Sequence, residues 1–176
     1  MTIETAAPII RRAVPEDAPA LAELARRSFV DAFGEGSDPH DLALHVARGY
    51  GQAQQAAEIA HPRITTLVAE VDGRLAAYAM IRRDEVPECV PDRTAAMIAR
   101  FYVDRPWHGR GLARRLMDAA LDEVRALGAR SVWLGVWEMN HRAIAFYAKC
   151  GYRDVGSHTY LFGTDPQTDR VMLREV

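Results

Sequence analysis

The sequence has few cysteines, no excess of basic charge and no long apolar run. Neither of its two cysteines, Cys89 and Cys150, belongs to a C-x-x-C motif or to a cluster with histidine that would indicate a metal or redox site. We therefore expect two reduced thiols and no bound metal. The net charge of −2 gives no basic field of the kind that attracts nucleic acid, so we expect no nucleic-acid partner.

The lack of long apolar runs excludes a further class of protein. The sequence has no run of about 18 apolar residues, which a membrane-spanning helix would need. Residues Met1 to Pro8 contain Glu4 and lack the apolar core of a signal peptide. We expect no membrane partner and a cytoplasmic location.

The residues that are present have the composition and number of one globular domain. The 176 residues are 49% hydrophobic and 26% charged, which is ordinary for a folded protein and excludes wholesale disorder. A chain of this length can bury a core without disulfides or a structural metal. No linker, repeat or low-complexity segment divides it, so we expect a single α/β domain over residues 1–176.

Hydrophobic periodicity predicts strands and helices in alternation. Asp72-Gly73 joins two apolar runs and is typical of a tight hairpin turn, because glycine adopts positive φ. The apolar faces of the first helix and of the helix after residue 108 are expected to extend to Ala32 and Leu127. The expected strands cover residues 9–12, 65–71, 74–82, 94–103, 131–136, 152–155, 158–162 and 170–176. The expected helices run from 15 to the glycines at 34 and 36, in two short pieces between 38 and 60, over 109–127 and over 140–150.

The segment from Phe101 to Met117 is the most informative part of the chain. An apolar strand leads into a turn with Gly109 and Gly111, whose lack of Cβ lets successive N–H groups approach an anion at the positive end of the following helix. A dinucleotide fingerprint would need glycine where Arg114 stands, and no Gly-Lys-Ser/Thr of a P-loop follows. Two interpretations remain, a phosphate cradle of another kind and a plain strand-to-helix turn that binds nothing.

A second informative segment is the helix expected after Asn140. Asn140 and Tyr147 are seven residues apart, so they lie on one face of a helix, separated by about 10 Å at 1.5 Å per residue. A tyrosine in this setting is either part of the core or a group that faces a ligand.

These two segments resemble the motifs of the Gcn5-related N-acetyltransferases (GNAT). Tyr102-Val103 followed by His-Gly-Arg-Gly-Leu-Ala at 108–113 is similar to motif A, Q/R-x-x-G-x-G/A. The segment 140–152, Asn-His-Arg-Ala-Ile-Ala-Phe-Tyr-Ala-Lys-Cys-Gly-Tyr, is similar to motif B, N-x-x-A-x-x-F/L-Y-x-K-x-G-F/Y. The resemblance implies a mixed sheet of about seven strands, largely antiparallel, flanked by about four helices, in which strands 94–103 and 131–136 form a parallel pair joined by a right-handed crossover.

The resemblance also implies the acyl donor and the residues that bind it. Acetyl-CoA is the implied donor, and no metal is implied. Phe101, Tyr102 and Val103 would pair through their backbone with the pantetheine arm, and Asn140 and Lys149 of motif B would join the coenzyme site. The turn whose amides would hold the pyrophosphate consists of His108, Gly109, Arg110, Gly111, Leu112 and Ala113, and His108 stands where the family has Gln or Arg.

The implied activity is transfer of an acetyl group to a primary amine by direct attack, without an acyl-enzyme. Tyr147 is the expected general acid, because the departing thiolate has a pKa of about 8.5 and a phenol one of about 10. The sequence does not single out the base that deprotonates the amine. Glu138 is the first candidate, and the others are Asp31, His45 and His141. Each of these residues is also compatible with a purely surface or structural role.

The acceptor is the least defined part of the interpretation. Residues 133–138 and 156–172 resemble a bacterial PaiA-like subgroup linked to acetylation of spermidine and spermine, which makes a polyamine the expected acceptor. The acidic residues that would bind a polycation are scattered: Asp31, Glu35, Asp38, Asp84, Glu85 and Glu88. The alternatives are an amino acid, antibiotic or protein amine as acceptor, a longer acyl donor, and a non-catalytic domain that senses acyl-CoA. A homodimer formed through the apolar terminal strands is a further expectation.

Overall fold

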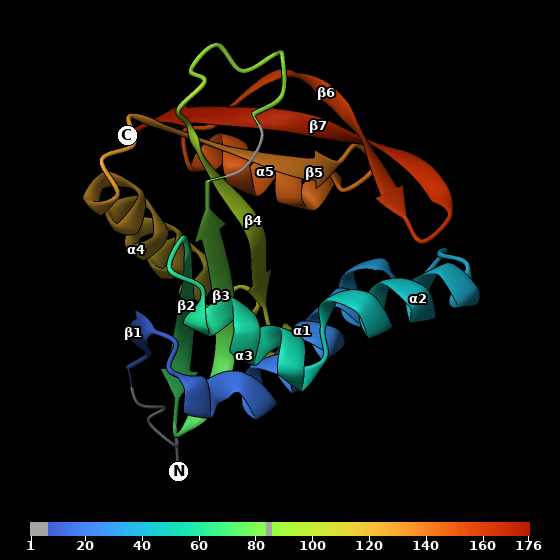
Figure 1. Cartoon of the computed structure of the whole chain (residues 1–176), viewed down its shortest axis with the longest axis vertical. Coiled ribbons are helices and arrows are strands. Elements are labelled where there is room, and N and C mark those ends of the chain that lie inside the picture. The colour runs from blue at the N-terminus through green and yellow to red at the C-terminus, as the bar shows by residue number, and fades with distance from the viewer. Residues whose placement is uncertain (1–6, 84–85) are drawn as a thin grey trace.

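The computed structural model describes residues 7–83 and 86–176, and in these residues a seven-stranded mixed sheet carries helices on both faces (Figure 1). The strands are β1 (Ile9–Arg12), β2 (Ile64–Val71), β3 (Arg74–Arg82), β4 (Ala96–Val103), β5 (Ser131–Trp137), β6 (Arg153–Phe162) and β7 (Asp165–Glu175). The helices are α1 (Ala18–Phe33), α2 (Pro39–Gly49), α3 (Gln52–Ala60), α4 (Leu112–Ala126) and α5 (His141–Lys149). Residues 1–6, Asp84 and Glu85 lie outside the described residues. Most of the segment from Met1 to Pro8, in which a signal peptide was not expected, is therefore not described.

The sheet has the strand order β1-β2-β3-β4-β5-β7-β6, and its pairing confirms the predicted mixed topology. β4 and β5 are parallel and are joined through α4, whereas all other neighbouring strands are antiparallel. The predicted hairpin at Asp72-Gly73 connects β2 and β3.

The parallel pair is short, and this shapes the molecule. β4 and β5 are in register only at Ala96 with Val132 and at Met97 with Trp133. Beyond Met97, β4 continues along β3 and β5 continues along β7. The two halves of the sheet, β1–β4 and β5–β7, therefore run in different directions (Figure 1).

Two apolar clusters hold the helices against the two faces of the sheet. On one face, α4 buries an apolar stripe against β2, β3 and β4. On the other face, α1 packs on β3 and β4 with Leu21, Leu24, Ala25 and Phe29. Burying each leucine or phenylalanine side chain contributes about 1.5–3 kcal/mol. The stripe on α4 consists of Leu112, Leu116, Met117, Ala120, Leu121 and Val124.

The predicted limits of the two long apolar faces were wrong at their C-terminal ends. Ala32 is exposed near the end of α1, and Leu127 is 42% exposed after the end of α4. The helix predicted to start at Gly109 starts at Leu112, because Gly109 and Gly111 adopt φ values of 73° and 79°, which a helix does not allow. These two glycines form a turn in front of the helix.

The C-terminal region differs from the prediction in a second way. Residues 152–155 and 158–162 were expected to be separate strands, but they form one strand, β6, with an irregularity in pairing between Asp154 and Gly156. β7 begins at Asp165, five residues earlier than expected, because the hairpin with β6 extends its pairing to Phe162 and Asp165. Among the described residues, no helix is long and apolar enough to cross a lipid bilayer.

The two leucines at 116 and 127 allow a matched test of the packing of α4. Leu116 is fully buried, so Leu116→Ala should lower the free energy of unfolding by about 2–5 kcal/mol through lost burial and a cavity. Leu127→Ala should change it by less than about 0.5 kcal/mol, because this side chain is exposed. Urea unfolding measures both, and equal losses would contradict the described packing.

Candidate active site

A cleft of about 1250 Å³ opens where β4 and β5 separate. One end is formed by the turn that precedes α4. Its middle is formed by β4, β5 and α5, and its other end by α1, α2 and the β6–β7 hairpin. The cleft therefore connects the predicted phosphate-binding turn with a second region that the motifs do not describe.

The turn before α4 presents unpaired backbone amides to this cleft. The amides of residues 109–114 donate to no acceptor within the described part of the chain, and the first intrahelical bond runs from the Arg115 amide to the Gly111 carbonyl, at 3.3 Å. A Cβ added to Gly109 or Gly111 would meet no protein atom within 4 Å, so the space in front of both glycines is open. Free N–H groups at the positive end of a helix bind anions, and a diphosphate fits this chemistry.

The side chains around the turn contact the protein itself. His108 Nε2 lies 2.8 Å from the carbonyl oxygen of Val103, so in the tautomer with Nε2 protonated it donates a hydrogen bond to the end of β4. The guanidinium of Arg110 lies over the ring of Trp107, 5.3 Å from its centroid. Arg114 lines the cleft and pairs with Asp118 at 3.1 Å. The imidazole at 108 thus joins the turn to the strand, and the backbone remains the main anion-binding group.

The predicted pantetheine strand also lies in the cleft. Phe101, Tyr102 and Val103 all line it, on the part of β4 that has left β5. The ring of Phe101 packs against Phe146 and Tyr147 of α5, with centroid distances of 5.8 and 6.2 Å. This contact fixes the position of α5 relative to the free edge of β4.

The two residues singled out on α5 both face the cleft, as their spacing predicted. Asn140 caps the helix, and its Oδ1 accepts a hydrogen bond from the amide of Ala143 at 3.1 Å. Tyr147 is 9% exposed, and its hydroxyl has no hydrogen-bond partner among the described residues. Burial raises the pKa of Tyr147 well above its usual value, so the phenol keeps its proton at neutral pH.

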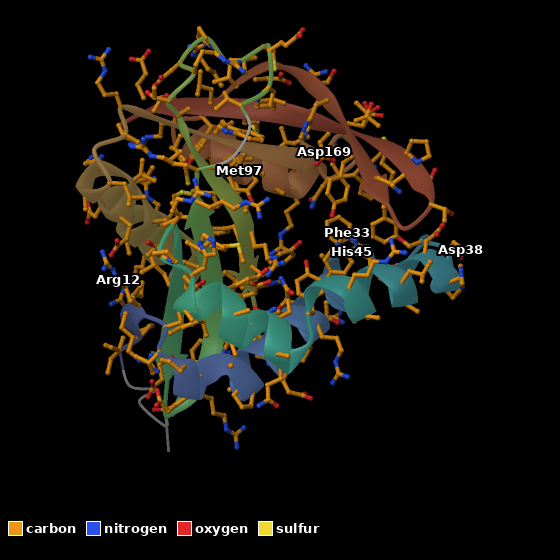
Figure 2. The ribbon with its side chains drawn as sticks, viewed as in Figure 1. Arg12, Phe33, Asp38, His45, Met97 and Asp169 are labelled. Carbon is orange, nitrogen blue, oxygen red and sulfur yellow. The ribbon has the colours of Figure 1, made fainter. Side chains whose placement is uncertain are left out.

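The far end of the cleft is rich in aromatic rings. Figure 2 shows Phe33 and His45 on the helical side of the opening and Asp169 on the opposite side. His45 stacks on Phe29 at 4.4 Å and on Phe162 at 5.3 Å, and burial lowers its pKa. The other aromatic residues at this end are Tyr50, Tyr102, Trp137 and Tyr160.

The charged groups at this end carry both signs. The most closely paired are Arg100 and Glu58, which are 2.7 Å apart, with the Arg100 guanidinium 5.0 Å from the centroid of the Tyr50 ring. The charged side chains that line this end are Asp31, Glu35, Arg48, Glu58, Arg82, Arg100 and Asp169. Of the acidic residues expected to bind a polycation, only Asp31 and Glu35 are in this set, because Asp38 caps α2, Glu88 lies elsewhere and Asp84 and Glu85 are outside the described residues.

Several residues predicted for the site lie outside the cleft. Glu138, the first candidate for the base, is exposed and does not line it, and neither does His141. Arg110 and Lys149 are exposed beside it, and the side chain of Leu112 is in the core, so only its amide belongs to the turn. Asp31 and His45 do line the cleft.

Sequence reasoning missed Asp169, which lines the cleft from β7. Its side chain is 13% exposed, and burial raises its pKa to about 6. The alternation of side chains along the strand could have identified this residue. Val171 and Leu173 lie on one face of β7, and Asp169 lies two residues earlier on the same face. The strand was expected to start at Arg170, which placed this residue in a loop.

Comparison with known proteins assigns the family. The model of the acetyltransferase (GNAT) family matches residues 19–152. The chain belongs to this family. It is 36% identical over 160 residues to an uncharacterized N-acetyltransferase of Mycobacterium bovis, covering 91% of this chain and 98% of the relative. The predicted class, an N-acetyltransferase with acetyl-CoA as donor, is therefore confirmed.

Solved GNAT structures share the fold at low sequence identity. The PaiA N-acetyltransferase of Thermoplasma acidophilum, in complex with coenzyme A, superposes with a TM-score of 0.76 at 19% identity, over 97% of this chain and 100% of that one. The ribosomal-protein-S18-alanine N-acetyltransferase of Escherichia coli gives a TM-score of 0.69 at 19% identity, over 97% and 94%. The described residues of this GNAT chain contain no group of histidine, cysteine and acidic side chains that would hold a metal ion.

The open space in front of Gly111 leads to a test of the anion site. Gly111→Leu should weaken binding of coenzyme A at least about tenfold, because the side chain blocks amides whose hydrogen bonds to a charged group contribute about 1.5–3 kcal/mol each. Titration calorimetry measures the affinity.

Gly73→Leu is the matched control for this variant. Gly73 has a φ of 74°, close to the 79° of Gly111, and a Cβ there also meets no protein atom. The two variants thus share the cost of a left-handed leucine, but Gly73 lies in the β2–β3 hairpin, away from the cleft. Coenzyme affinity that is unchanged in Gly111→Leu, or equally reduced in both variants, would contradict the anion site.

Proposed function

We propose that this GNAT enzyme transfers the acetyl group of acetyl-CoA directly to a primary amine of a small molecule, with Tyr147 as the general acid. The observation that carries the proposal is the row of unpaired amides at residues 109–114, which opens into the same cleft as the hydroxyl-bearing ring of Tyr147. The amides of residues 112–114 are the first N–H groups of α4, which have no intrahelical partner, and the left-handed turn at Gly109 and Gly111 adds further free donors beside them.

Different parts of the cleft bind different parts of the donor. The turn at 108–113 holds the diphosphate through its backbone, the free edge of β4 at Phe101, Tyr102 and Val103 accompanies the pantetheine arm, and Asn140 at the start of α5 lies beside it. Lys149 is exposed on the last turn of α5 and does not line the cleft.

The reaction needs few side chains. The amine nitrogen forms a bond to the thioester carbonyl carbon, negative charge develops on the carbonyl oxygen, and N–H groups at the divergent part of β4 stabilise it. The C–S bond then breaks, and Tyr147 donates its proton to the sulfur that leaves. Because its pKa is raised, Tyr147 is protonated at the start of each cycle and recovers its proton readily afterwards.

The chemistry of the far end of the cleft bears on the acceptor. A polyamine would be favoured by a concentration of carboxylates, but here three arginines accompany the acidic groups and aromatic rings line the same end. We therefore propose a monoamine with an apolar or aromatic skeleton as the preferred acceptor, ahead of spermidine and spermine. A protein amine, as in the name of the ribosomal-protein neighbour, is the second candidate.

Tyr147→Phe tests the acid role. The variant should lower kcat at least about tenfold, since general-acid help is lost, and leave the affinity for coenzyme A nearly unchanged. Tyr152→Phe is the control, because Tyr152 is also buried and packs edge-on against Tyr147 at 5.9 Å but does not line the cleft. Release of free thiol at saturating substrates and several pH values gives kcat, and equal turnover of Tyr147→Phe and the wild type would remove Tyr147 from this role.

A panel of amines tests the acceptor. We expect faster thiol release with phenylalkyl or indolylalkyl monoamines than with spermidine or spermine, and a mass increase of one acetyl group on the product. The panel includes an amino acid, an aminoglycoside and a peptide with a free N-terminus as further classes. A preference for the polyamines would contradict the proposed acceptor, and binding of acetyl-CoA without consumption with every amine would contradict the proposed activity.

A further inference from the structure

Asp169 lines the cleft but takes no part in the steps assigned to Tyr147 and the backbone N–H groups. Its carboxylate projects from β7 toward Gly135 of β5, in the part of β5 that has left β4. A Cβ at Gly135 would lie only 3.0 Å from Asp169 Oδ2 and 2.9 Å from His158 Nε2. The missing side chain at 135 thus leaves the space that both polar groups occupy, beside the open edge where the cleft passes.

The charge of Asp169 has no compensating cation among the described residues. His158, opposite it on β6, is 3.9 Å away, which is too long for a hydrogen bond, and burial lowers the pKa of this imidazole so that it is neutral. The other titratable group that faces it is Tyr160 of β6, whose pKa is raised, first by burial and then by the charge of Asp169. The adjacent Arg170 pairs with Asp154 instead, at 2.7 Å.

We propose that Asp169 is the general base that takes the proton from the acceptor amine. This inference rests on the proposed function. As the amine nitrogen bonds to the carbonyl carbon, one of its protons moves to a carboxylate oxygen of Asp169, directly or through a water molecule, and the neutral acid later returns this proton to solvent. No oxidant or further reactant is needed.

The physical state of Asp169 suits this task better than that of the other acids in the cleft. With a pKa of about 6, it is largely ionised at pH 7 and above, and it is more basic than an ordinary aspartate. Glu58 is held by Arg100, and Asp31 and Glu35 are exposed. Burial without a partner is the environment in which enzymes place a catalytic carboxylate.

The aromatic end of the cleft brings the acceptor to this carboxylate. Asp169 pairs across the sheet with Trp137, and Trp137 lies 6.2 Å from Phe33, centroid to centroid. We place the apolar part of the amine among these rings, with its nitrogen directed to Asp169. The same arrangement therefore supports both proposals, Asp169 as the base and an apolar monoamine as the preferred acceptor.

Asp169→Asn tests the proposal, with Asp165→Asn as the matched control on the same strand. Asp165 is exposed at the β6–β7 turn and does not line the cleft. With the best amine of the panel at saturation, Asp169→Asn should lower kcat about 100-fold and leave the affinity for coenzyme A unchanged. The wild type and Asp165→Asn should show a limb in which kcat rises with pH through about 6, and Asp169→Asn should lack it.

A stability measurement separates this role from a structural one. A carboxylate with a raised pKa destabilises the folded state once it ionises, so its stabilising contribution, present at low pH, is lost as the pH rises through about 6. The urea midpoint of Asp169→Asn at pH 8 should therefore equal or exceed that of the wild type.

Three outcomes would overturn the proposal. Wild-type kcat in Asp169→Asn, with the limb near pH 6 retained, would overturn it while leaving the acetyltransferase activity established. A markedly lower urea midpoint at pH 8 would show that the charge is paired in the fold and is structural. Failure of the wild type to consume acetyl-CoA with any amine would overturn the proposed function first, and the base with it.

Discussion

The early divergence of the parallel strands β4 and β5 is the constraint on which the rest of this structure depends. Two pairs of residues remain in register, and then each strand follows its antiparallel neighbour instead. Residues 99–103 of β4 are half-buried and line the cleft, so water or a bound molecule can satisfy their unpaired backbone groups. This one departure from regular pairing creates the cleft and the free edge of β4. It also leaves Gly135 of β5, which lies beside Asp169 of β7, next to the cleft.

The helix that crosses between these strands adds the second element of the site. α4 is anchored by an apolar stripe against one face of the sheet, so its N-terminus is fixed at the end of β4. The left-handed turn at Gly109 and Gly111 then leaves backbone amides unpaired at the cleft, beside the side chains of His108 and Arg114. The contact from His108 to the Val103 carbonyl ties the turn to the strand, which explains how an imidazole can stand where the family has Gln or Arg.

The parts of the site that were predictable from sequence are those encoded within one short segment. The glycine turn, the spacing of Asn140 and Tyr147 and the hairpin at Asp72-Gly73 depend on neighbours in the chain, and the structure places all of them as expected. Asp169 depends on pairing between β5, β6 and β7, which no local pattern specifies. Glu138 was a candidate only because it follows an apolar strand, and it lies just past the end of β5, where it faces solvent.

One physical cause, exclusion of water, acts on both ionisable groups to which we assign proton transfer. Burial disfavours the charged form of each group, so it holds the proton on Tyr147 and makes the carboxylate of Asp169 a stronger base. The same low polarity strengthens the interaction of backbone N–H groups with a developing oxyanion. Where β4 and β5 part, core side chains such as Leu134 and Val136 line the cleft, so the opening that admits the substrates also holds Tyr147 and Asp169 in surroundings that shift their pKa values.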